Sequence, residues 1–137
     1  MLMEDLIGRV IIDTFWDSVY GDIYMATHLG VVKMSPHGDC CAVCFVQHCS
    51  NTDALRQAIL LRVEHMEHVS NTSNEYGDVE EEWGYVLHTD KGTATIEMRV
   101  EHNGYYGGSL EISKSDRIRG DRLEVHQDPE GYQFGVA

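Results

Sequence analysis

The stretch from Thr93 to Ser113, TATIEMRVEHNGYYGGSLEIS, constrains the fold more than any other part of this sequence. Its first half alternates apolar and polar side chains, the pattern of a strand with one buried face. The apolar positions are Ala94, Ile96, Met98 and Val100. Asn103-Gly104 follows, a dipeptide typical of tight hairpin turns because both residues tolerate positive φ. The alternation resumes at Leu110 and Ile112, so the stretch predicts a β-hairpin.

The register of this hairpin needs an irregularity. A strict two-residue turn would put the apolar residues after the turn on the face opposite those before it. Either the loop takes a third residue, or Gly107-Gly108 hosts a bulge, where a missing Cβ permits the distortion. Both arrangements leave Tyr105 and Tyr106 in an open, irregular patch. That patch is the first candidate for a functional surface.

The rest of the chain predicts a mostly antiparallel sheet of about seven or eight strands. Turn residues separate short β-prone runs, and Pro36-His37-Gly38-Asp39 is expected to break the first meander. The further predicted strands are Leu6 to Phe15, Asp22 to Ala26, Val31 to Met34, Cys41 to Val46, Trp83 to His88 and Leu123 to Val125.

One short helix is predicted near residues 52–60, which makes the expected fold class α+β. Ser50-Asn51-Thr52-Asp53 supplies N-cap residues, and Ala54 to Ile59 has helical composition. The end of the helix is ambiguous, since the apolar period could carry it to His68, or a strand could begin at Leu61. Asn71 to Glu82 is polar and acidic without an apolar period, so a mobile loop is expected there.

Length and composition indicate a single domain spanning residues 1–137, with a loosely held tail from about residue 126. No apolar run approaches the ~20 residues needed to span a bilayer, and the N-terminus does not read as a signal peptide. A cytoplasmic protein is therefore expected. The formal net charge is -13, and such a chain repels phosphate backbones, so direct nucleic-acid binding is not expected.

Several phrases resemble a family of small domains of unknown function that bacteriophages encode. They are DLIGRVI (Asp5 to Ile11), HGDCC (His37 to Cys41), EWGYVLHTDKGTATI (Glu82 to Ile96) and EHNGYYGGSLEI (Glu101 to Ile112). Two departures are Ala42, where the family usually has an acid, and Gly107, where it usually has serine. The resemblance implies phage origin and an α+β build, and it favours strand over helix for residues 60–69.

Four cysteines, Cys40, Cys41, Cys44 and Cys49, lie within ten residues. Buried, reduced thiols are the favoured interpretation; a structural zinc site and disulfide or redox chemistry are the alternatives. Cys40 with His37 could act as nucleophile and base, but the sequence places no third group to orient them. We therefore expect a non-enzymatic protein without a cofactor.

The favoured hypothesis is a ligand-binding protein that sequesters a nucleotide-derived host immune signal, as a homo-oligomer. Ring faces, an amide and cations in an otherwise acidic chain could hold a planar base and its phosphates. The candidate residues are Asn103, Tyr105, Tyr106, Trp83, Arg99, Arg117 and Arg119.

The alternative hypothesis is an acidic inhibitor that imitates nucleic acid and occupies a groove on a basic host protein. The acidic segment Glu75 to Glu82 and the overall charge would then steer association, which should slow steeply as salt is added. The two hypotheses differ in their partner: a small-molecule nucleotide or a basic host protein.

Overall fold

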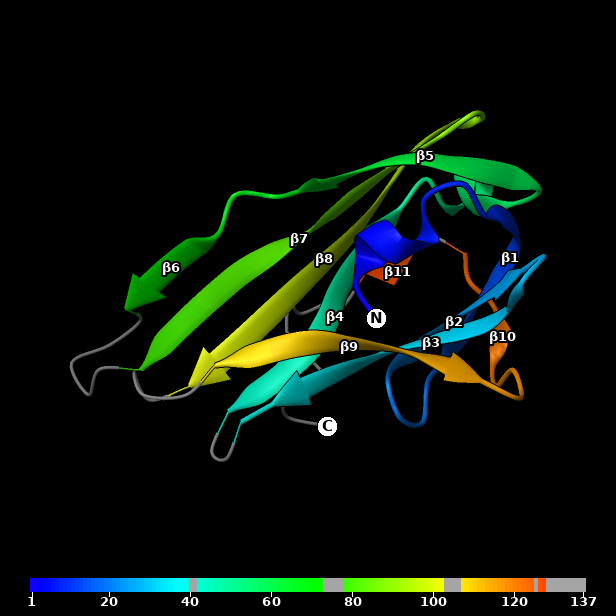
Figure 1. Ribbon diagram of the computed structural model, residues 1–137. Helices are drawn as coiled ribbons and strands as arrows, with labels where there is room; N and C mark the ends of the chain where they lie inside the picture. The colour runs from blue at the N-terminus through cyan, green and yellow to red at the C-terminus, as the bar shows by residue number, and fades with distance from the viewer. Residues whose placement is uncertain (40–41, 73–77, 103–106, 125, 128–137) are drawn as a thin grey trace.

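The computed structural model describes residues 1–39, 42–72, 78–102, 107–124 and 126–127 (Figure 1). Within them the chain forms two 3-10 turns, η1 (Met3–Leu6) and η2 (Thr52–Leu55), and eleven strands. The strands are β1 (Val10–Asp17), β2 (Asp22–Thr27), β3 (Gly30–Gly38), β4 (Val43–Ser50), β5 (Ala58–His65), β6 (Val69–Thr72), β7 (Val79–Thr89), β8 (Gly92–His102), β9 (Gly108–Ser115), β10 (Asp121–Arg122) and β11 (His126–Gln127). The predicted C-terminal tail lies outside the described residues apart from β11, which pairs with β4.

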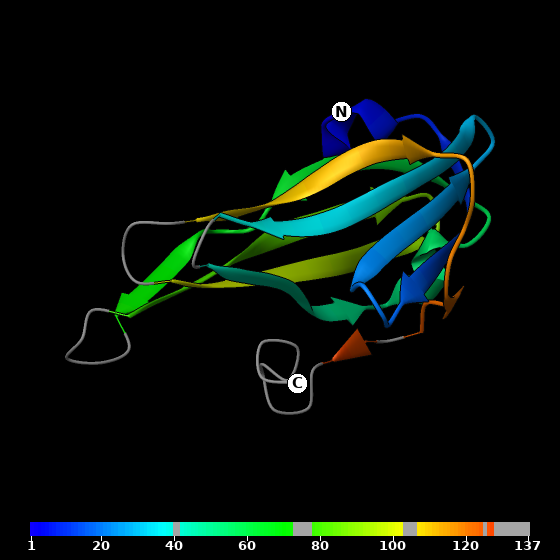
Figure 2. The same ribbon diagram turned by 90° about the horizontal axis from the view of Figure 1, so that it is seen from below.

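The strands form a continuous antiparallel sheet that folds over into two layers, seen from below in Figure 2. Neighbouring strands follow the order β11-β4-β8-β7-β5-β1-β2-β3-β9, with β10 beside β1 and β6 beside β7. Strand β5 joins the layers, because its first residues pair with β1 and the rest pair with β7. The core lies between the layers, where apolar side chains of both are buried.

Strand β8 confirms the prediction made from its alternating pattern. Its apolar side chains at positions 94, 96, 98 and 100 are all buried, and the strand is hydrogen-bonded on one side to β4 and on the other to β7. The predicted meander β1-β2-β3 is also confirmed. Burial of every second residue in a central strand is what fixes this register.

The predicted hairpin between residues 93 and 113 is wrong. Strand β8 pairs with β4 and β7, whereas β9 pairs with β3 in the other layer. The chain therefore crosses from one layer to the other between β8 and β9. This crossing removes the register problem, because Met98 and Ile112 then face the same core from opposite sides.

Strand β3 does not break at Pro36 as predicted, but continues to Gly38. Its pairing with β2 ends at Met34, while its pairing with β9 runs on through Pro36 to Gly38. At Pro36 only one edge of the strand is therefore hydrogen-bonded to a neighbour. A proline, which has no N–H to donate, is tolerated at such a position.

The helix predicted near residues 52–60 is also wrong, so the described chain is mostly β and contains 3-10 turns without an α-helix. Asn51 does not cap a helix; it adopts the left-handed conformation, and its Nδ2 donates to the carbonyl oxygen of Thr93 at 2.7 Å. Gln57, between the end of η2 and the start of β5, also has positive φ (51°). The extended structure expected for residues 60–69 is confirmed over most of that range, because residues 60–65 belong to β5 and residue 69 begins β6.

The acidic segment predicted to be a loop is partly strand. Residues 71–72 belong to β6, and residues 79–82 belong to β7, which pairs along its length with β8. The carboxylates of β7 are neutralised there: Glu80 and Glu82 lie 2.8 Å and 3.4 Å from the Arg99 guanidinium. Charge pairing across neighbouring strands allows an acidic sequence without an apolar period to form a strand.

Glu81 accepts hydrogen bonds from two histidines. The Nε2 atoms of His68 and His102 lie 2.9 Å and 2.8 Å from its two carboxylate oxygens. Partial burial acts to raise the pKa of Glu81, but these hydrogen bonds and the charges of the two rings outweigh it, so the pKa falls below its ordinary value. Ionised Glu81 therefore stabilises the folded state.

We expect this contribution to be fully present above the ordinary glutamate pKa of about 4.3 and to be lost as the pH falls through the lower folded-state pKa. In thermal melts between pH 6 and pH 3, Glu81→Gln should show a shallower loss of Tm than the wild type. Glu111→Gln, which removes the same charge at an exposed position of β9, is the control and should follow the wild-type slope. Parallel curves for all three proteins would contradict the assignment.

Candidate functional site

The residues at the centre of the predicted binding surface, Asn103, Tyr105 and Tyr106, lie outside the described residues. Their neighbour Gly107 is described, and it is held against Asp39. The Asp39 amide donates to the Gly107 carbonyl at 2.9 Å, and the Gly107 amide donates to Asp39 Oδ2 at 3.1 Å. Asp39 and Gly107, one from each of two phrases far apart in the sequence, therefore meet at one end of the fold.

Trp83 and Arg99 do not join a common surface. Trp83 pairs across the strands with Met98 and packs against the core, with its ring 5.9 Å from that of Tyr85. Arg99 follows Met98 in the strand and so points to the opposite face. Its side chain is 16% exposed and is paired with Glu80 and Glu82, so its charge is already neutralised.

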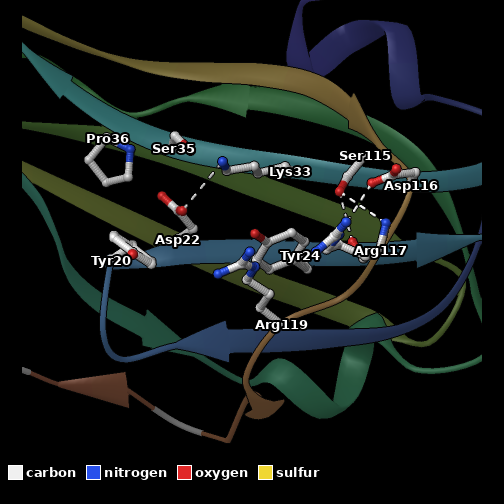
Figure 3. Close-up of a pocket in the computed structure, with 10 residues that line it drawn as sticks. All are labelled: Tyr20, Asp22, Tyr24, Lys33, Ser35, Pro36, Ser115, Asp116, Arg117 and Arg119. Carbon is white, nitrogen blue, oxygen red and sulfur yellow. Dashed lines mark hydrogen bonds and ion pairs between the residues drawn. The ribbon is translucent and has the colours of Figure 1, made fainter.

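Arg117 and Arg119 do come together, and aromatic and charged side chains of other segments lie beside them. They line a cavity of about 570 Å³ on the outer face of the β2–β3 layer. We call it the cationic cavity; its lining residues are Tyr20, Asp22, Tyr24, Lys33, Ser35, Pro36, Ser115, Asp116, Arg117 and Arg119. In Figure 3, Tyr20 and Pro36 lie at one end of the view and Ser115 to Arg117 at the other, with Tyr24 and Arg119 between them.

The floor of the cationic cavity is set by strand register. Tyr24 of β2 lies opposite Lys33 of β3, so both side chains point to the same face. Tyr24 is nevertheless buried, which shows that this outer face is covered. The cover is the segment from 116 to 120, which leaves β9 at the sheet edge and crosses to β10 beside β1 (Figure 3).

Gly120 and Ser115 fix the segment that carries the two arginines. Gly120 has φ +89°, and a Cβ built on it would lie 1.9 Å from the Trp16 carbonyl oxygen. Only glycine permits this close approach. At the other end, the Ser115 hydroxyl accepts from the Arg117 amide at 3.3 Å and donates to the Arg117 carbonyl at 2.7 Å, which closes a local turn.

The cationic cavity carries more positive than negative side chains, three against two, in a chain of formal charge -13. Lys33 Nζ lies 3.8 Å from Asp22, and Arg117 Nε lies 3.5 Å from Asp116. The Arg119 guanidinium lies 6.0 Å from the centre of the Tyr20 ring, a distance at which a cation–π attraction still acts. The arrangement therefore offers guanidinium and ammonium donors beside an exposed aromatic ring.

Tyr20, Tyr24 and Lys33 were not among the residues predicted from the sequence to bind a ligand. The turn chemistry at residues 17–22 is visible in the sequence, and Tyr24 and Lys33 fall in runs that were predicted as strands. What the sequence does not show is that the segment after β9 returns across these strands. Without that contact, nothing connects Lys33 with Arg119.

The two described cysteines, Cys44 and Cys49, are free. Burial raises the pKa of Cys44 to about 11, although hydrogen bonds with the backbone of His37 and Ser109 act against it. Burial, together with the charge of Glu97, raises the pKa of Cys49 to about 12. Both thiols therefore stay protonated near neutral pH and are poor nucleophiles.

Within the described ranges, the His, Cys, Asp and Glu side chains form no group of three or more that could hold a metal ion. Cys40 and Cys41 of the zinc hypothesis lie outside those ranges. The described part of the chain also contains no helix that is long and apolar enough to cross a membrane.

A family model described as a domain of unknown function, DUF7448, matches residues 4–112. Tyr20, Tyr24 and Lys33 fall inside this match, and Arg117 and Arg119 fall after it. No curated protein and no solved structure matches the chain.

Proposed function

Because the chain belongs to the DUF7448 family, whose function is unknown, we propose a function from the geometry of its own site. The protein binds a small anionic ligand of the nucleotide class in the cationic cavity, without catalysing its conversion. Arg117, Arg119 and Lys33 hold the phosphate groups, and the Tyr20 ring offers a face for stacking.

The observation that carries this proposal is the convergence of three cations and two tyrosines on one cavity of about 570 Å³. This volume lies within the range of small-molecule sites, roughly 300–1,000 Å³. Arg99, by comparison, is held between two carboxylates at 2.8 Å and 3.4 Å. The ion pairs of Lys33 and Arg117 are longer, 3.8 Å and 3.5 Å, so a phosphate group can compete for these cations.

For a protein of phage origin, which the sequence resemblance implies, such binding would sequester a nucleotide-derived host immune signal in the host cytoplasm. A homo-oligomer would raise the number of sites per particle. The geometry gives less support to the hypothesis of an acidic inhibitor that imitates nucleic acid. Glu80 and Glu82, which would contact a basic partner, form ion pairs with Arg99 on β8.

The proposal is tested by isothermal titration calorimetry with inorganic pyrophosphate. We expect binding by the wild type, and at least about tenfold weaker binding for Arg119→Ala, since a hydrogen bond to a charged group contributes about 1.5–3 kcal/mol. Affinity should also fall steeply as salt is added.

Arg62→Ala is the matched control for the titration. Arg62 lies on β5, is 63% exposed, and pairs with Glu64 at 3.5 Å. Its loss changes the net charge by the same amount as Arg119→Ala but should leave pyrophosphate affinity within twofold of the wild type. Equal weakening by both substitutions would mean that general electrostatics, and not this cavity, attracts the anion.

A further inference from the structure

Two carboxylates lie opposite each other where β1 and β2 meet at their turn. Asp17 of β1 pairs with Asp22 of β2 in the strand register. Their side chains are therefore on the same face of the sheet, with Cβ atoms about 4.5–5.5 Å apart. Both residues are buried, with 5% and 6% of their surface exposed. Like charges directly opposite each other destabilise a sheet, so this pair calls for a cation.

The carboxylate of Asp17 is only half satisfied. Its Oδ1 accepts from the Val19 amide at 3.0 Å, whereas its Oδ2 is buried and has no hydrogen-bond partner among the described residues. A charged oxygen without a partner is costly to bury. The Asp17 side chain points to the face that carries the cationic cavity, because Asp22, directly opposite, lines that cavity.

Asp22 is weakly partnered where it borders the cationic cavity. Figure 3 shows its carboxylate directed toward Lys33, at the end of the cavity where Tyr20 and Pro36 lie. The Lys33 Nζ atom is 3.8 Å from Asp22 Oδ2, a distance too long for a hydrogen bond. A phosphate group that binds Lys33 would take this ion pair from Asp22, and the two carboxylates would then repel the phosphate.

A magnesium ion reverses this repulsion. Mg²⁺ takes oxygen ligands, keeps several waters, and is usually bound by one or two carboxylates together with the phosphate oxygens of a ligand. No three His, Cys, Asp or Glu side chains of the described ranges form a metal site by themselves. An ion shared with a phosphate needs fewer protein ligands, and Asp17 with Asp22 meets that smaller requirement.

We infer that Asp17 and Asp22 form a subsite for a divalent cation beside the cationic cavity, and that the protein binds its ligand as a magnesium complex. This inference rests on the proposed function and adds the metal ion to it. The ion joins the carboxylates to the phosphate, while the arginines and Lys33 hold the remaining phosphate oxygens. The site then favours ligands with two or more linked phosphates, because these chelate Mg²⁺.

The test is calorimetric titration of the wild-type protein with inorganic pyrophosphate, once in EDTA and once in excess MgCl₂. We expect at least about tenfold tighter binding in MgCl₂, because the carboxylates repel free pyrophosphate but coordinate the ion that its complex carries. The direction of the change is informative. Mg²⁺ lowers the negative charge of pyrophosphate, so a cavity that attracts charge alone would bind the complex more weakly.

Two substitutions remove the carboxylates one at a time. Asp22→Asn changes the shape little, and Asp17→Asn keeps an acceptor for the Val19 amide. Each should lose the gain in MgCl₂ and bind pyrophosphate in EDTA at least as tightly as the wild type, which also shows that the variant is folded.

Asp116→Asn is the matched control for these substitutions. Asp116 lines the same cavity, but its side chain is 89% exposed and pairs with Arg117 at 3.5 Å. Since exposed ion pairs contribute little, this variant should keep the gain in MgCl₂ within about twofold of the wild type.

Manganese locates the ion directly. Mn²⁺ binds to the same kinds of oxygen ligand as Mg²⁺, and it broadens the nuclear magnetic resonance signals of nearby nuclei. With pyrophosphate present, a small amount of MnCl₂ should broaden the backbone amide signals of Asp17 and Asp22 before that of Arg62.

Pyrophosphate binding that is unchanged or weaker in MgCl₂ would overturn the cation subsite and leave the proposed function standing. An undiminished gain in Asp22→Asn would also overturn it, as would Mn²⁺ broadening that spares Asp17 and Asp22. If pyrophosphate binds in neither medium, the proposed function is wrong and the cation subsite is wrong with it.

Discussion

Replacing Gly120 with alanine is expected to lower the free energy of unfolding by about 3 kcal/mol or more. The added Cβ would lie 1.9 Å from the carbonyl oxygen of Trp16 and 2.8 Å from the amide nitrogen of Asp17. Both are backbone atoms of β1 and cannot rotate away. The φ of +89° is also unfavourable for any residue with a Cβ.

Gly8→Ala is the matched control for this substitution. Gly8 has nearly the same φ, +93°, but an added Cβ would meet nothing within 4 Å. Chemical denaturation should therefore show a loss of only about 1 kcal/mol for Gly8→Ala, from the conformation alone. Equal losses for the two variants would show that the segment does not pack against β1 as described. Gly120→Ala should also weaken pyrophosphate binding, since this segment carries Arg117 and Arg119.

The second large effect is expected at Asp13, a carboxylate of β1 that is only 8% exposed. Its Oδ2 accepts from Arg122 Nε at 2.7 Å, and its Oδ1 lies 3.3 Å from Arg56 Nε and accepts from the Thr14 amide at 2.8 Å. It thereby ties β10 and the segment after η2 to β1. Asp13→Ala should lower the free energy of unfolding by about 2 kcal/mol. This is less than for a fully buried ion pair, because Arg122 is largely exposed.

Asp53 provides the comparison for Asp13, because it also pairs with Arg56 but is 79% exposed. Surface ion pairs contribute little, so Asp53→Ala should change the stability by about 0.5 kcal/mol or less. Urea unfolding of both variants measures the difference. A loss for Asp53→Ala as large as that for Asp13→Ala would mean that burial of the carboxylate does not govern the effect.

Several strands, β8 among them, could be predicted from the sequence because they depend on local alternation. Positions 94 to 100 of β8 alternate strictly, and the structure buries every apolar member of that series. The pairing of the strands could not be predicted in the same way. Asn103-Gly104 indicates a hairpin wherever both flanking strands have free edges, but both edges of β8 are occupied by β4 and β7. Which strands pair with each other depends on the tertiary structure. Here the pairing of β8 with β4 and β7 prevents the hairpin that the local sequence predicts.

The predicted helix failed for a similar reason. Ala54 and Leu55 have good helical propensity, but in the structure they are buried core residues of a 3-10 turn, and Ala58 and Leu60 continue inward on β5. Helical propensity amounts to a few tenths of a kcal/mol per residue, whereas burying a leucine side chain contributes about 1.5–3 kcal/mol. Core packing therefore decided the backbone conformation here.

The candidate site was predictable in part. Arg117 and Arg119 stand out in the sequence as neighbouring cations in an acidic chain, and they do line a cavity with aromatic rings. The rings are those of Tyr20, in the turn between β1 and β2, and Tyr24 of β2, about 100 positions away in the sequence. Arg99 looks equivalent to the other arginines in the sequence, but the β7–β8 register places it beside two glutamates.

The most direct test of the central claim is nuclear magnetic resonance mapping of the wild-type protein during titration with inorganic pyrophosphate. We expect chemical shift changes at the Arg117 and Arg119 side-chain Nε–H groups and at the backbone amides of Tyr24 and Lys33, and none at Arg62. Shift changes confined to Arg99 and Trp83, or no change at the cationic cavity at saturating pyrophosphate, would contradict it.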